Sequence, residues 1–144
     1  DWLAVKAVVN SVQIPIFVNG DITSCETAKT ALEDSRAAGV MVGRAAMGQP
    51  WLLAQIADYI SGLPVRLVPD MLQRNLMMIK HLTDITQEKG EIGLRSARKH
   101  FASYCDHLEE SDELRAVAMR TSSVSELKDA IFEYFLKSSR LTAA

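Results

Sequence analysis

The chain has 144 residues, of which 48% are hydrophobic and 24% are charged, and its formal net charge is −2. This composition is typical of a globular protein with one domain or two small ones, and it excludes collagen-like, disordered and low-complexity chains. No apolar run approaches the roughly 20 residues of a membrane helix. The chain as a whole also lacks the excess of basic residues that is typical of nucleic-acid-binding proteins. Cys25 and Cys105 stand far apart with no metal-ligand spacing, so we expect a reducing, cytoplasmic setting without a disulfide or a metal site.

The first part of the chain alternates helical and strand patterns. Apolar residues recur at helical spacing over residues 2–12, and an unbroken apolar run over 14–18 predicts a strand buried on both faces. A capping-box pattern at residues 23–26 predicts the start of a helix. A second short strand over 39–42 and a helix over 50–60 follow. This alternation indicates parallel α/β units.

Two parallel strands do not make a stable sheet by themselves, because each needs neighbouring strands. We therefore expect a preceding part of the same protein to complete the sheet. The chain opens on Asp1 rather than Met, which fits that expectation.

A proline-rich stretch divides the sequence. Residues 61–69 contain two of the four prolines, and we interpret them as a linker between a domain over 1–62 and a domain over 63–144. Beyond the linker no strand pattern occurs, and amphipathic segments joined by short loops predict a helical bundle. The predicted helices cover residues 71–89, 94–108 and 111–120 and a last segment that begins with a capping box at 123–126.

The apolar stripes of the first two predicted helices define the expected core. We expect the first helix to turn Leu72, Leu76 and Ile79 inward. The second helix is expected to bury Leu94, Ala97, Phe101, Cys105 and Leu108.

Glycine follows each predicted strand. Asn19, Gly20 and Asp21 follow the first strand, and Gly43 and Arg44 follow the second. Ligands of α/β sheets bind at the carboxyl ends of the strands, where glycine lets the backbone approach and arginine contacts a phosphate. Two interpretations stay open, namely simple turns and a phosphate site.

A basic run lies on the second predicted bundle helix. Arg95, Arg98 and Lys99 follow the i, i+3, i+4 spacing of one helix face, and His100 adjoins them. Such a face suits contact with a phosphate backbone. The alternative is a solvated face on which Glu91 pairs with Arg95, with His100 in a structural role.

Three runs resemble the tRNA-dihydrouridine synthases. They are IPIFVNGDI at 14–22, VMVGRAAMGQPW at 40–51 and GLRSARKH at 93–100, the last of which is similar to the bacterial B-type branch. The resemblance implies an FMN-dependent TIM-type (β/α)8 barrel with a C-terminal helical domain. This chain would then be an α/β fragment, the last two βα units of the barrel, followed by an all-α helical bundle.

The resemblance also implies a role for each motif. The phosphate end of FMN would be held by Asn19, Gly20, Asp21, Gly43 and Arg44. The tRNA would be bound by Arg95, Arg98, Lys99 and His100. NADPH would reduce the flavin, which would reduce the C5–C6 bond of a uridine in tRNA.

The catalytic cysteine of the family has no counterpart in this sequence. We therefore expect the catalytic residues to lie in a missing N-terminal barrel half, and we expect this chain alone to be inactive. We expect tRNA to be its partner, and we expect it to bind neither a membrane nor a metal. Two alternatives stay open: a non-catalytic helical RNA-binding module, and another FMN barrel oxidoreductase that acts on a small molecule.

Overall fold

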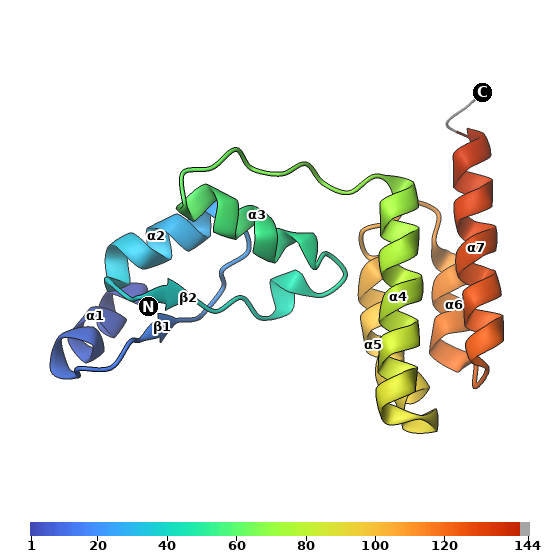
Figure 1. The fold of residues 1–144 in the computed structure, drawn as a ribbon, viewed down its shortest axis with the longest axis horizontal. Helices are drawn as coiled ribbons and strands as arrows, with labels where there is room; N and C mark the ends of the chain where they lie inside the picture. The colour runs from blue at the N-terminus through green and yellow to red at the C-terminus, as the bar shows by residue number, and fades with distance from the viewer. Residues whose placement is uncertain (142–144) are drawn as a thin grey trace. The chain divides into compact units, whose positions relative to one another are not determined.

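A computed structural model describes the backbone of residues 1–141 and the side chains of these residues except 91 and 139–141. The chain forms two compact units, an α/β unit (Asp1–Val68) and a helical unit (Pro69–Ala144), which Figure 1 shows in order from blue to red. The division falls at the distal end of the predicted linker.

The α/β unit alternates helices with two short strands. Its elements are α1 (Trp2–Ser11), β1 (Phe17–Val18), α2 (Cys25–Ser35), β2 (Gly39–Val40), the 3-10 turn η1 (Arg44–Ala46) and α3 (Trp51–Ile60). The strands pair in parallel, with Phe17 opposite Gly39 and Val18 opposite Val40. A backbone hydrogen bond from Met41 N to Val18 O, 2.8 Å, extends the pairing beyond the second strand.

The prediction that the first strand is buried on both faces is wrong. Val18 is only 1% exposed and packs with Ile22 and Ala28 of the α/β core, whereas its neighbour Phe17 is 63% exposed. Successive strand residues point to opposite faces of a sheet, and only the face toward α2 is covered within the described residues.

The capping box of α2 lies one residue later than predicted. Ser24 Oγ accepts a hydrogen bond from the Thr27 amide at 3.1 Å, and Thr27 Oγ1 accepts one from the Ser24 amide at 2.9 Å. Threonine replaces the usual Glu at the third helical position, and Glu26 lies one position earlier, where hydrogen bonds from its own backbone amide and the Ser24 side chain lower the pKa of its carboxyl group.

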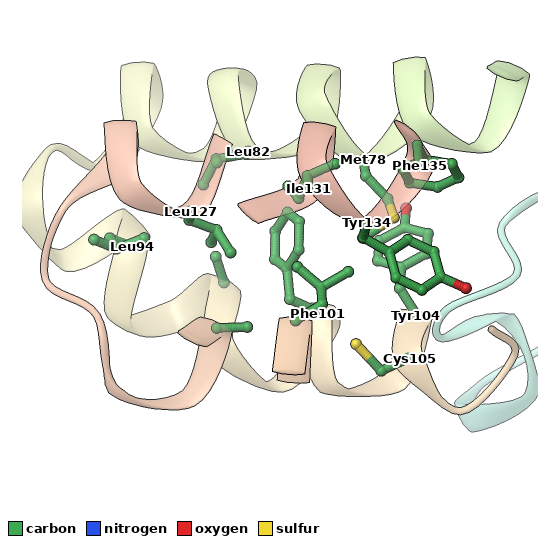
Figure 2. Packing of buried hydrophobic residues seen from close by; sticks show 13 residues of the cluster. Met78, Leu82, Leu94, Phe101, Tyr104, Cys105, Leu127, Ile131, Tyr134 and Phe135 are labelled. Carbon is green, nitrogen blue, oxygen red and sulfur yellow. The ribbon is translucent and has the colours of Figure 1, made fainter. Parts of the chain in front are cut away.

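The helical unit consists of α4 (Met71–Lys89), α5 (Glu91–Cys105), α6 (Asp112–Arg120) and α7 (Val124–Leu141). Helix α4 packs on α5 and α7, and α6 packs on the same two helices. Figure 2 shows side chains from these helices meeting in one core. Its buried members include Met78, Leu82, Leu94, Ala97, Phe101, Cys105, Leu127, Ile131, Tyr134 and Phe135.

The predicted inward stripe of α4 is wrong. Leu72 and Leu76 are 68% and 59% exposed, and Ile79 is only partly buried. The buried residues are Asn75, Met78 and Leu82. Because α4 must face α5 and α7 at once, its buried stripe is rotated by roughly 90° from the predicted one. No helix within residues 1–141 is long and apolar enough to cross a membrane.

Candidate functional site

The loops after β1 and β2 leave the same edge of the strand pair. An ion pair joins them, with Arg44 Nη2 lying 3.5 Å from Asp21 Oδ1. Both side chains are about nine-tenths exposed, at 92% for Arg44 and 88% for Asp21. The structure therefore brings together the two loops that the sequence singled out, at the carboxyl edge where ligands of α/β proteins bind.

The first loop is held in an unusual backbone conformation. Gly20 has φ +119° and Asp21 has φ +48°, which is the left-handed region that favours glycine. Trp2 Nε1 donates to Gly20 O at 2.8 Å, and Asn19 Oδ1 accepts from the Gly20 amide at 2.7 Å. These bonds fix the turn and leave the Asn19 amide NH2 group without a partner among the described residues.

The second loop offers space and positive charge. A Cβ atom placed on Gly43 would meet nothing within 4 Å, so a ligand can approach the backbone there. The donors of the two loops, namely the Arg44 guanidinium and the Asn19 amide, suit a phosphate. The Asp21 carboxylate only accepts hydrogen bonds, so it suits the orientation of Arg44 and not direct contact with an anion.

The basic run lies on α5, and its members differ in surroundings. Arg95 and Lys99 are exposed. Arg98 is half-buried, and its Nη2 donates to the carbonyl oxygens of Thr121 at 3.1 Å and Arg120 at 3.5 Å. Arg98 therefore binds the last carbonyls of α6, where a cation is favoured by the helix dipole. The alternative pairing of Arg95 with Glu91 involves a side chain outside those described.

His100 packs between helices. Its ring centroid lies 5.1 Å from that of His81 on α4, and His81 Nδ1 lies 3.3 Å from Tyr104 Oη. Burial, together with the nearby His81, Lys99 and Lys89, lowers the pKa of His100. Burial also lowers the pKa of His81. A neutral pair of rings between α4 and α5 agrees with the structural alternative for His100.

The two cysteines have no activating environment. Burial and the charge of Glu26 raise the pKa of the Cys25 thiol, and burial raises the pKa of the Cys105 thiol in the core. Neither is a nucleophilic thiolate at neutral pH. Within the described residues no group of three or more side chains could hold a metal ion.

Sequence reasoning missed the residues that support the site residues from other elements. Trp2 fixes Gly20, Thr121 anchors Arg98, and His81 packs on His100. Each partner lies at least 18 residues away in the chain, so no local spacing in the sequence could have indicated these pairs.

Comparison with known proteins gives the family. The family described as "Dihydrouridine synthase (Dus)" matches residues 1–139, and the chain belongs to this family. A "Probable tRNA-dihydrouridine synthase" of Rickettsia bellii is 38% identical over 136 residues, which cover 94% of this chain and 42% of the relative. The "tRNA-dihydrouridine synthase B" of Vibrio cholerae is 34% identical over 142 residues, with the same two coverages.

A third relative, the "Probable tRNA-dihydrouridine synthase" of Rhodobacter capsulatus, is 42% identical over 123 residues, which cover 85% of this chain and 37% of the relative. The chain thus spans about two fifths of the length of these relatives. The family predicted from the three sequence runs is confirmed, and B-type synthases are among its relatives.

Proposed function

We propose that this chain is the C-terminal portion of a cytoplasmic, FMN-dependent tRNA-dihydrouridine synthase of the B type. The whole enzyme reduces the C5–C6 double bond of a uridine in tRNA with electrons from NADPH. The observation that carries the proposal is the family match along residues 1–139, which spans both units.

The α/β unit supplies part of the FMN phosphate site. Arg44 binds the phosphate, and the Asn19 amide and the backbone of Gly20 and Gly43 line the same site. Asp21 holds Arg44 in position, a role that their separation of 3.5 Å supports. When bound, the flavin supplies the hydride chemistry. The residues of this chain position it and neutralise its phosphate.

The remainder of the barrel is a partner that packs against the α/β unit, in which residues 1–62 form the last two βα units. The exposed apolar residues Phe17 and Met41 lie where further barrel strands would cover them, which supports this arrangement. That N-terminal barrel half carries the catalytic residues, since the catalytic cysteine that the resemblance implies has no counterpart in this sequence.

Residues 63–144 bind tRNA. The exposed Arg95 and Lys99 contact backbone phosphates of the tRNA. Arg98 lies beside them and contributes to tRNA binding from a position that its hydrogen bond to Thr121 O holds in place. His100 belongs to the same run and holds α5 against α4 through His81.

The flavin site is tested in the complete protein by substitution of Arg44. We expect the purified protein to show flavin absorbance, Arg44→Ala to weaken FMN binding by roughly ten-fold or more, and Arg44→Lys to lose less because the charge stays. An Arg44→Ala variant that retains FMN with wild-type affinity would contradict the assigned phosphate site.

A further inference from the structure

A hollow of about 620 Å³ opens in the helical unit beside the basic run. It lies where the end of α4, the start of α5 and the turn between α6 and α7 meet. It is lined by Thr86, Gly90, Leu94, Arg95, Arg98, Thr121, Ser122 and Val124. Its volume falls within the range of sites for small organic ligands.

The position of Arg98 in this hollow is fixed before any ligand arrives. Its Nη2 is bonded to the carbonyl oxygens of Thr121 and Arg120, and its Nε is buried without a hydrogen-bond partner among the described residues. No described carboxylate forms an ion pair with Arg98, and its described hydrogen-bond acceptors are backbone carbonyl oxygens. A guanidinium plane held in this way is suited to stacking on a flat, electron-rich ring.

The other lining residues supply an apolar surface and hydrogen-bond acceptors. Leu94 and Val124 provide the apolar part. The Thr86 hydroxyl donates to Leu82 O at 2.7 Å and keeps its lone pairs for an N–H donor. The Thr121 hydroxyl donates to the Glu126 carboxylate and already accepts from the Ser123 amide at 3.0 Å, so one of its two lone pairs remains. A bare anion would need none of these features.

We propose that this hollow binds one unstacked nucleotide of an RNA. The base lies against Arg98, Leu94 and Val124, and its phosphate is bound by Arg95 at the exposed rim. Single-stranded RNA is recognised in this manner, by bases that leave the stack and lie against flat side chains. The inference rests on the proposed tRNA binding by residues 63–144 and adds a specific base pocket to it.

The test fills the hollow without changing its charge. Ser122 is exposed and lines the hollow, and Ser125 is exposed on the first turn of α7 outside it. We compare Ser122→Trp with Ser125→Trp in the complete protein, using fluorescence anisotropy with an unmodified tRNA transcript at several salt concentrations. Ser122→Trp should weaken binding by about ten-fold with an unchanged salt slope, because base stacking and not phosphate contact is lost. Ser125→Trp should bind like the wild type.

Two further substitutions, Arg95→Ala and Ser122→Cys, test the phosphate contact and the hollow separately. Arg95→Ala should reduce the salt slope by about one. A Ser122→Cys thiol should be protected by the transcript from alkylation, as followed by mass spectrometry, whereas a Ser125→Cys thiol should not. This variant is small enough to keep the fold if Ser122→Trp lowers the melting temperature.

The outcomes separate the two proposals. If Ser122→Trp binds like the wild type, or if the Ser122→Cys thiol is not protected, the base pocket is overturned while tRNA binding stands. A reduced salt slope in Ser122→Trp would also overturn it, since the Trp would then displace a phosphate. If the wild-type protein does not bind the transcript at all, the proposed role of residues 63–144 fails first.

Discussion

Asp58 and Arg66 form a bidentate ion pair that holds the segment after α3 against that helix. Arg66 Nε donates to Asp58 Oδ2 at 2.7 Å, and Nη2 donates to Oδ1 at 2.9 Å. The Arg66 amide also donates to Oδ2 at 3.1 Å, and Gln55 Nε2 donates to Arg66 O at 3.0 Å. Bidentate pairs of this kind are the stronger class of charge-assisted bonds.

The consequence of this pair is a short free segment in the linker. At the other end of the linker, Arg74 Nε donates to Pro69 O at 2.9 Å within the helical unit. Between these two fixed points lie only Leu67 and Val68, both exposed. We therefore expect any flexing of the linker to be concentrated at these two residues.

Substitution of Asp58 should release the residues before this segment. In Asp58→Asn the charge of the acceptor is lost, so Arg66 should detach from α3 and trypsin should cleave after Arg66 several-fold faster than in the wild type. The exposed Asp129, which forms no ion pair with any described side chain, gives the control Asp129→Asn. Equal cleavage rates after Arg66 in wild type and Asp58→Asn would contradict the role of the pair.

The ion pair between Asp58 and Arg66 also predicts that the free energy of unfolding decreases at low pH. The Arg66 guanidinium lowers the pKa of Asp58 to about 2, below its ordinary value of about 3.9. A carboxylate with a lowered pKa stabilises the folded state above its unfolded pKa, and this contribution is lost as the pH falls through the folded pKa. Urea unfolding should show the wild type losing its advantage over Asp58→Asn between about pH 4 and pH 2. A constant difference across that range would argue against the pair.

The histidine pair predicts a second dependence, near neutral pH. Burial lowers the pKa of both His81 and His100 in the folded state, so the unfolded chain takes up protons first as the pH falls. Stability should therefore be greatest above about pH 6.5 and should decline below it. His81→Phe keeps an aromatic ring and should make this decline shallower, whereas His107→Phe, at an exposed position, should not. Thermal melting at pH 7.5 and 5.5 measures the difference, and parallel declines in all three proteins would refute the explanation.

Gly93 on α5 lies directly against the backbone of α4. A Cβ atom there would lie 2.3 Å from the carbonyl oxygen of Ile85, which is backbone and cannot rotate away. Gly93→Ala should therefore destabilise the chain by about 2 kcal/mol, even though alanine favours helices. Ser125→Ala, at an exposed position on the first turn of α7, should leave the melting temperature nearly unchanged. Denaturant titration of both variants tests this, and a stabilised Gly93→Ala would contradict the close packing.

The sequence predicted the local features of the fold well, because caps and periodicity are local. The ends of α3 and α4 and the two glycine loops followed from such patterns. The burial of α4 did not, since the stripe through Leu72 and Leu76 is as regular as the one through Met78 and Leu82. Which of them is buried depends on where α5 and α7 lie.

In the candidate site, too, the sequence pattern predicted local groupings but not contacts between residues far apart in the chain. Spacing grouped Arg95, Arg98 and Lys99 on one helix face, but it could not indicate that Arg98 binds the end of α6 through Thr121. The distinction matters for function, because it separates a fixed guanidinium from the exposed cations beside it. Likewise the link between Asp21 and Arg44 depends on the parallel pairing of β1 and β2, which joins residues 23 positions apart.

The measurement that tests the central claim most directly is the dihydrouridine content of an unmodified tRNA transcript after incubation with FMN, NADPH and the complete protein. We predict that the complete protein forms dihydrouridine and that the 144-residue chain alone forms none, because the catalytic cysteine that the family resemblance implies has no counterpart in this sequence. A flavin-loaded complete protein that leaves every uridine unreduced, or turnover by the 144-residue chain alone, would contradict the account.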